Sequence, residues 1–222
     1  MTQTPPIHFD THGLVPVIVQ DHLTGEIRML AHANAEAVRA TLTSGRATFW
    51  SRSRSELWEK GATSGNTVFV RDVLVDCDND GLVYSGQPEG PSCHTGAASC
   101  FFQSLDDEGI AHRRDVPQSL LARLEATLEA RKSADAGASY TRSLYDAGTE
   151  GIGRKILEEA GELVAALAGE TTERVAAEAA DVIYHLMVGL RARGVPLRSV
   201  LGVLAERTKV SGHEEKAGRS SR

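Results

Sequence analysis

The sequence has few cysteines, few aromatic residues and no long hydrophobic run. Only three of its 222 residues are Cys, and aromatic residues make up 5% of the chain. The longest apolar stretch, 182–190, is interrupted by His185 and falls well short of the roughly 18 residues of a membrane-spanning helix. Residues 1–20 lack a basic segment followed by an apolar one, which a secretory signal requires. These absences predict a cytoplasmic protein with no membrane partner.

Positive charge is also scarce. The chain carries 24 Lys and Arg against 30 Asp and Glu, giving a net charge of −6. This balance argues against non-specific nucleic-acid binding as the main activity, because such binding depends on neutralising phosphates with basic side chains. Hydrophobic residues make up 41% of the sequence, which is enough for a folded core without disulfides. The length suits one large domain or two ordinary ones.

The composition changes near Val116. All five Phe, both Trp and all three Cys precede this residue, whereas most of the alanines follow it. Alanine is the strongest helix former. The sequence therefore predicts two domains, 1–115 and 116–222, joined by a connector at 112–119.

The two parts differ in hydrophobic periodicity. The first is expected to be a β-rich α+β domain with strands at 15–20, 26–30, 47–52, 67–75 and 82–85. One short helix is expected at 35–44, between a capping Asn34 and Gly45. The second part is expected to be an all-α helical bundle with helices at 120–132, 152–168, 173–191 and 197–207.

The cysteines are spaced C-x15-C-x6-C, at Cys77, Cys93 and Cys100. Three cysteines cannot pair completely in one chain, and a cytoplasmic location disfavours disulfides. They could be small buried hydrophobic residues, but each lies in polar, turn-like sequence. Three thiolates suit zinc and leave a fourth position for water, as catalytic zinc requires. His94 is either a further ligand or a base beside the metal, and the base-deaminase pattern of H-x-E with P-C-x-x-C is absent.

Three aspartates surround the first cysteine: Asp76, Asp78 and Asp80. On an extended segment alternate residues point to one side, so these carboxylates can converge while Cys77 faces away. A calcium loop is the alternative, since Gly81 stands where an EF-hand loop has glycine. That loop also needs a Glu at position 12, where this chain has Gln87. A magnesium site beside a phosphate group is therefore favoured.

Two polar segments, 50–54 and 58–65, combine cations, hydroxyls and glycines. Such groups can hold a phosphate by charge and by backbone N–H donors, although a solvated polar loop has the same composition. The candidates for phosphate contact are Arg52, Arg54, Lys60 and Ser64.

Together with these segments, the blocks Met29-Leu30-Ala31, WSRSR, LWEKGATSG, DCDND, SCHTG and SCF resemble phosphoribosyl-AMP cyclohydrolase over about residues 14–105. The resemblance implies a homodimer with zinc at its interface, bound by the three cysteines Cys77, Cys93 and Cys100. It also implies magnesium on Asp76, Asp78 and Asp80. The sequence departs from the family at His32-Ala33, where larger residues usually follow Leu-Ala, which affects packing rather than chemistry.

In the second part, segments 156–163 and 175–182 repeat a pattern of carboxylates at an offset of 19 residues. Each helix would carry an apolar stripe, formed by Ile156, Ala160, Leu163 and Leu167 in one and by Val175, Ala179, Val182 and Leu186 in the other. The carboxylates Glu159, Glu162, Glu178 and Asp181 lie beside these stripes and could meet along one seam. A solvated acidic face is the alternative, but crowding four anions without a cation is costly. Oxygen-only ligands favour Mg²⁺ or Mn²⁺.

This arrangement resembles the all-α nucleoside triphosphate pyrophosphatases. More closely, segments 138–141, 155–162 and 178–186 resemble phosphoribosyl-ATP pyrophosphohydrolase, over about residues 118–208. Both families belong to histidine biosynthesis and occur fused in this order. The resemblance implies that the second part hydrolyses the α–β bond of phosphoribosyl-ATP with Mg²⁺, and that the first part opens the N1–C6 bond of phosphoribosyl-AMP.

Particular roles follow from these resemblances. Zinc lowers the pKa of bound water toward about 7, which supplies hydroxide at neutral pH, and His94 would transfer the proton. Magnesium held by the helical carboxylates would neutralise phosphate charge while one carboxylate orients water. Lys155 either pairs with these carboxylates or reaches a phosphate. Two rival hypotheses are a pyrophosphohydrolase whose first part only dimerises, and a general nucleotide pyrophosphatase.

Overall fold

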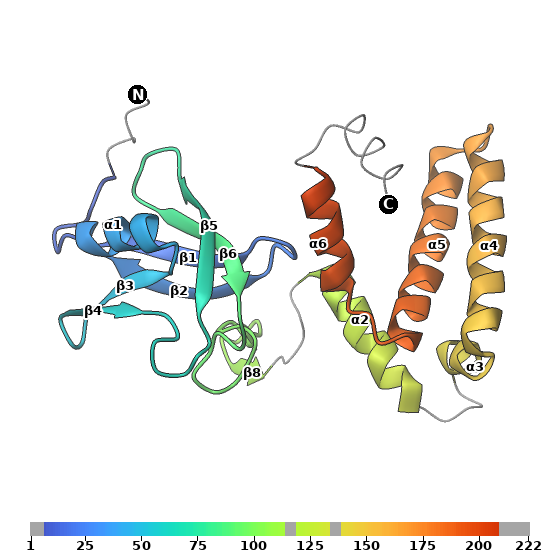
Figure 1. Ribbon diagram of the computed structural model, residues 1–222, viewed down its shortest axis with the longest axis horizontal. Coiled ribbons are helices and arrows are strands. Elements are labelled where there is room, and N and C mark those ends of the chain that lie inside the picture. The colour runs from blue at the N-terminus through green and yellow to red at the C-terminus, as the bar shows by residue number, and fades with distance from the viewer. Residues whose placement is uncertain (1–6, 114–118, 134–138, 209–222) are drawn as a thin grey trace, which may run out of the picture. The chain divides into compact units, whose positions relative to one another are not determined.

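Figure 1 shows the computed structural model, which describes residues 7–113, 119–133 and 139–208. The chain divides into two compact units, Met1–Ser119 and Leu120–Arg222. The described residues of the first unit are rich in strands, and those of the second form only helices, which confirms the predicted pair of domain classes. The expected boundary between residues 115 and 116 lies outside the described residues. None of the described helices is both long and apolar enough to cross a membrane.

The first unit is built on a four-stranded sheet in the order β2-β1-β6-β5. Its strands are β1 (Val15–Asp21), β2 (Ile27–Ala33), β5 (Val68–Val75) and β6 (Leu82–Pro88). β1 pairs antiparallel with β2 and parallel with β6, and β5 pairs antiparallel with β6. Alternate valines of β1 are fully buried, as the period of two in a strand requires. The sheet therefore has one face on the core of this unit.

Two hairpins and one helix complete the described part of this unit. They are β3 (Thr48–Ser51) with β4 (Glu56–Glu59), β7 (Gln103–Leu105) with β8 (Ala111–Arg113), and α1 (Ala35–Ser44). The helix begins after Asn34, whose Oδ1 accepts from the Ala37 N–H at 2.8 Å, and ends at Gly45 with a φ of 69°. Phe49 lies against Trp58 and Tyr84, with ring centroids 5.1 and 5.6 Å apart. This packing fixes the β3–β4 hairpin on the sheet, immediately before the loop that follows β4.

The second unit contains α2 (Leu120–Ala130), a 3-10 turn η1 (Arg131–Ser133), α3 (Tyr140–Asp146), α4 (Gly148–Leu167), α5 (Thr172–Ala192) and α6 (Leu197–Arg207). Figure 1 shows α4 and α5 side by side. The four expected helices are confirmed, although α4 begins four residues earlier than expected. Helix α3 was not expected, because seven residues are too few to show a helical period. Buried side chains from α2, α3, α4 and α5 form the core: Leu128, Leu144, Ile152, Met187 and Val188.

The predicted apolar stripes were partly wrong. Leu167 and Leu186 remain 65% and 43% exposed, whereas Ile152 and Val188 are buried. At Gly189 a Cβ would stand 3.4 Å from the side chains of Ile152 and Ile156, so α5 packs on α4 at this position. The buried face of each helix therefore differs in part from the expected stripe.

Candidate active sites

A cavity of about 510 Å³ in the first unit brings together five of the predicted site residues. It is lined by the loop after β4 and by the segment that carries the second and third cysteines. The five residues are Lys60, Ser64, Cys93, His94 and Cys100. The expected phosphate-binding loop and two of the expected zinc ligands thus share one cavity, although they are about 30 residues apart in sequence.

The loop after β4 is closed by its own residues. Gly61 has a φ of 86°, and a Cβ there would lie 2.4 Å from the backbone of Asn66 and Thr67, so only glycine fits. The Nζ of Lys60 donates to the carbonyl oxygen of Asn66 at 2.9 Å, and this side chain is 7% exposed. Desolvation lowers the pKa of Lys60. Lys60 therefore shapes the loop and places a positive charge at the cavity wall.

The two thiols of the cavity have different proton affinities. Burial acts to raise the pKa of Cys93, but hydrogen bonds from the Thr95 hydroxyl and from other neighbours outweigh it and lower this pKa. Desolvation and the adjacent Cys93 raise the pKa of Cys100 to about 11. His94 Nδ1 lies 3.8 Å from the Cys93 sulfur. Two thiols of different acidity thus stand beside each other, and a divalent cation bound by both would displace their protons.

The bond from the Thr95 Oγ1 to the Cys93 Sγ, 3.2 Å long, gives a first prediction. Thr95→Val removes the donor with little change of volume, so we expect the pKa of Cys93 to rise and its alkylation at pH 7 to slow in metal-free protein, since only the thiolate reacts. Site-resolved mass spectrometry measures the rate. Thr63→Val, at another residue of the cavity wall, should leave it unchanged. An unaltered rate in the Thr95 variant would refute this role.

Other predicted residues lie outside the cavity lining. Arg52 and Arg54 occupy the exposed turn between β3 and β4, where Arg54 pairs with Glu56 at 3.1 Å. Cys77 is exposed at the end of β5, and its sulfur contacts only the Asp78 carboxylate among the hydrogen bonds of the described residues, at 3.9 Å. Within the described chain the three thiols do not all lie within 4.8 Å of one another. One copy of the chain thus brings together two of the three expected zinc ligands.

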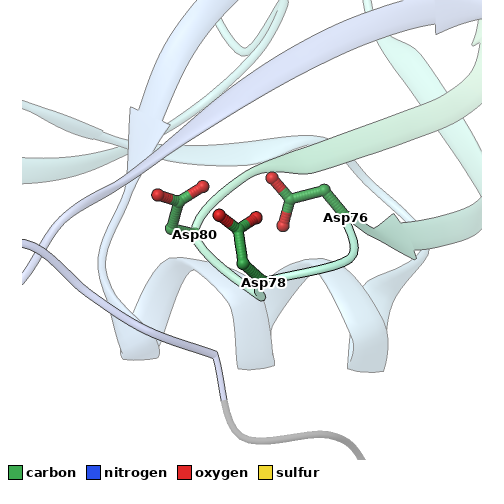
Figure 2. A group of neighbouring side chains, drawn as sticks. All are labelled: Asp76, Asp78 and Asp80. Atoms are coloured by element: carbon green, nitrogen blue, oxygen red, sulfur yellow. The ribbon is translucent and has the colours of Figure 1, made fainter.

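The three aspartates after β5 converge, as Figure 2 shows. Each of Asp76, Asp78 and Asp80 offers a carboxylate oxygen within 4.8 Å of the other two. The expected reason was wrong: the segment is a turn, with Asn79 at a φ of 66°, rather than an extended strand. The Gly81 N–H donates to Asp76 and lowers its pKa, whereas repulsion from Asp78 raises the pKa of Asp80. A cation would relieve this repulsion.

The second unit places three of its four predicted carboxylates in one group. Glu159 of α4 and Glu178 and Asp181 of α5 have oxygens within 4.8 Å of one another. Glu159 and Glu178 are 8% and 2% exposed, so these two carboxylates do not belong to a solvated acidic face, whereas Asp181 is exposed. Glu162 is exposed and lies outside this group, although its charge still acts on Glu178.

Glu178 is the least compensated carboxylate of this group. One oxygen accepts from Arg174 at 2.6 Å, but the buried Oε2 has no hydrogen-bond partner among the described residues. Burial raises the pKa of Glu178, and the neighbouring carboxylates raise it further against the effect of Arg174. Lys155 pairs with Glu158 and Glu159 at 2.9 Å each, which raises the pKa of Lys155. A buried oxygen without a partner, facing two other carboxylates, fits a hard divalent cation.

Two residues that were not predicted, the buried His185 and the exposed Tyr140, lie beside this group. His185 Nδ1 donates to the Asp181 carbonyl oxygen at 2.9 Å, so Nε2 accepts from the Tyr140 hydroxyl at 3.0 Å. The same ring lies 3.9 Å from Glu159. The four-residue spacing from Asp181 to His185 on one helix was the available signal. Tyr140 could not be paired with His185 from sequence, because the two are 45 residues apart.

Comparisons with known proteins identify the family of each domain. Residues 29–102 match the model of the phosphoribosyl-AMP cyclohydrolase family, and residues 121–208 match that of phosphoribosyl-ATP pyrophosphohydrolase. A Prochlorococcus marinus protein named "Histidine biosynthesis bifunctional protein HisIE" is 42% identical over 205 residues, which cover 90% of this chain and 93% of that protein. The chain belongs to this bifunctional family.

Other members of the bifunctional family are similarly related. The Thermus thermophilus protein of the same name is 42% identical over 201 residues, covering 90% of this chain and 92% of the relative. That of Bacillus subtilis is 40% identical over 207 residues, covering 93% and 97%. Both predicted resemblances are confirmed. The chain is a bifunctional enzyme of histidine biosynthesis with a cyclohydrolase and a pyrophosphohydrolase domain, so neither rival hypothesis holds.

Proposed function

We propose that the two activities use different metals on separate residues of the chain. Zinc would be held by Cys77, Cys93 and Cys100 in the first domain, and magnesium by the aspartate turn and by the carboxylates of α4 and α5. Ligand chemistry supports this division, because thiolates select zinc whereas carboxylates select magnesium. The buried Glu178 oxygen without a partner carries the proposal for the helical domain. The adjacent Cys93 and Cys100 thiols carry it for the first domain.

We propose further that the enzyme is a homodimer whose interface completes the zinc site. The separation of Cys77 from the other two thiols within one chain supports a ligand supplied by a second copy. An exposed apolar row on α4 also suits burial against another subunit. Its members Leu157, Val164 and Leu167 are 65% to 75% exposed.

Mixing two inactive variants tests this arrangement. In a dimer of one Cys77→Ser chain and one Cys93→Ser chain, one zinc site would carry both lesions and the other would be intact. Random reassociation should then restore about a quarter of the wild-type ring-opening rate. Each variant alone should be inactive, and mixing each with itself is the control. If the mixture stays inactive although mass spectrometry shows mixed dimers, the shared site is wrong.

In the first domain the substrate would be phosphoribosyl-AMP, with its adenine ring in the cavity. When bound, zinc would acidify a water molecule and so supply the nucleophile near neutral pH. His94, beside Cys93, would carry the proton to the ring nitrogen released when the N1–C6 bond breaks. Ser64 and the Lys60 charge would hold a phosphate at the loop after β4, and Arg52 and Arg54 would contact the phosphates from the β3–β4 turn.

In the helical domain the substrate would be phosphoribosyl-ATP. Glu159, Glu178 and Asp181 would bind magnesium, which when bound neutralises charge developing on the phosphates. Glu162, exposed at the edge of this group, would orient the water molecule that hydrolyses the bond between the α- and β-phosphates. Lys155, held by Glu159, would contact a substrate phosphate at the same edge. Pyrophosphate would leave, and phosphoribosyl-AMP would pass to the other domain.

We place the boundary between the two domains near residues 115 and 116, and the enzyme in the cytoplasm. All three cysteines are free thiols, which is typical of a reducing compartment. The substrates are small nucleotides, and the acidic net charge of −6 does not suit a nucleic-acid partner.

A further inference from the structure

Arg28, near the start of β2, is a buried cation that the sequence analysis did not single out. It is 9% exposed. Its Nε donates to the Ser92 hydroxyl at 3.3 Å, and its Nη2 donates to the Gly90 carbonyl oxygen at 3.1 Å. Its Nη1 lies 3.9 Å from Glu26. The guanidinium therefore holds the residues that directly precede Cys93.

The backbone of the same strand end holds the other side of the cysteine segment. The Cys100 N–H donates to the Arg28 carbonyl oxygen at 2.8 Å, and the Ser99 hydroxyl donates to the Ile27 carbonyl oxygen, also at 2.8 Å. Within this segment the Cys93 N–H donates to the Ala97 carbonyl oxygen at 3.1 Å, which closes a turn. Ile27 and Arg28 of β2 thus hydrogen-bond to the chain just before Cys93 and at Cys100.

The attachment of the cysteine segment to β2 on both sides indicates a role for Arg28 beyond packing. A buried guanidinium is costly unless hydrogen bonds and negative charge compensate it. The positive charges of Arg28 and Lys60 both act on Cys100. The planar guanidinium holds two acceptors in a fixed geometry, whereas a lysine ammonium can bond two acceptors but imposes no plane on them.

We propose that Arg28 is a positioning residue for the zinc site: it fixes the 90–100 segment so that Cys93 and Cys100 present their sulfurs together. The proposal rests on the zinc site proposed above. It predicts that Arg28 governs zinc affinity without touching substrate. Supporting groups around metal ligands typically contribute about 10- to 100-fold in metal affinity.

The test measures zinc affinity of the full-length protein by competition with a chromophoric chelator. Arg28→Met should weaken zinc binding about 10- to 100-fold, and the cobalt-substituted variant should show an altered thiolate-to-cobalt absorption band. Arg28→Lys keeps the charge but loses the fork, so its affinity should stay below that of the wild type. Arg39→Met, on the exposed face of α1, is the matched control and should bind zinc normally.

Ser92→Ala keeps the test decisive if Arg28→Met does not fold. It removes one acceptor of the fork without changing charge, and we expect a several-fold loss of zinc affinity. Pyrophosphate release by each variant reports whether the helical domain is intact. Wild-type affinity in Arg28→Met or Ser92→Ala, or full restoration by Arg28→Lys, would overturn the positioning role. If the wild-type protein itself binds no zinc, the proposed zinc site fails instead.

Discussion

Replacing Cys93 with Ser should reduce ring opening of phosphoribosyl-AMP by several orders of magnitude and leave pyrophosphate release nearly unchanged. Cys93 is the thiol with the lowered pKa, and its side chain lines the cavity beside Cys100 and His94. A serine hydroxyl is a poor zinc ligand, so the variant would lose the metal that activates water at neutral pH. Elemental analysis together with separate assays of the two reactions checks this.

Pyrophosphate release is the internal control for the Cys93→Ser variant. Size measurement should accompany both assays, because loss of an interfacial metal could dissociate a dimer that the helical domain needs. A dimeric variant that loses both activities would contradict separate sites. Full ring opening in a variant shown to be zinc-free would contradict the zinc mechanism itself.

Glu178→Gln should impair pyrophosphate release and spare ring opening, the reverse of the effect expected for Cys93→Ser. We expect pyrophosphate release to fall about 100-fold or more, since the variant weakens the binding of a metal worth several kcal/mol to the transition state. Ring opening of supplied phosphoribosyl-AMP should be nearly intact. Because the surroundings raise the pKa of Glu178, they disfavour its charge, and a neutral side chain should raise the melting temperature of the metal-free protein. Activity assays and a thermal melt measure both effects.

Glu150→Gln is the matched control for this substitution. Glu150 lies at the exposed start of α4 and pairs only with Arg154 in the same helix, among the ion pairs of the described residues. Its replacement should change neither activity. A Glu178→Gln protein that is less stable and inactive in both reactions would show that Glu178 supports the fold rather than the metal.

The sequence predicted local structure well where the signal is local. Helix α1 has the expected bounds because Asn34 and Gly45 are caps with strong preferences. The strand at Glu56–Glu59 and the hairpin of β7 and β8 were not predicted, because these strands are short and rich in polar residues. The buried faces of α4 and α5 were predicted only in part, because they depend on how the two helices pack against the rest of the bundle.

The candidate sites likewise combine features that the sequence predicts with features that only the tertiary structure shows. The convergence of Asp76, Asp78 and Asp80 was foreseen because they are neighbours in sequence, although the turn that produces it was not. The pairing of Glu159 with Glu178 and Asp181 followed from a repeat, yet Glu162 lies outside the group. The cavity joining Lys60 to Cys93 and Cys100 needs the tertiary fold. The contacts of Thr95 with Cys93 and of Tyr140 with His185 emerge only from distances between atoms.

Selective removal of zinc during turnover tests the central claim most directly. The full-length enzyme, supplied with phosphoribosyl-ATP and saturating Mg²⁺, is treated with a zinc-selective chelator while pyrophosphate, phosphoribosyl-AMP and the ring-opened product are followed together. If thiolates hold zinc in one domain and carboxylates hold magnesium in the other, pyrophosphate release continues, phosphoribosyl-AMP accumulates and ring opening stops, and added Zn²⁺ restores it. Ring opening that continues in protein shown to be zinc-free, or loss of pyrophosphate release together with ring opening while the enzyme stays folded and dimeric, would contradict the account.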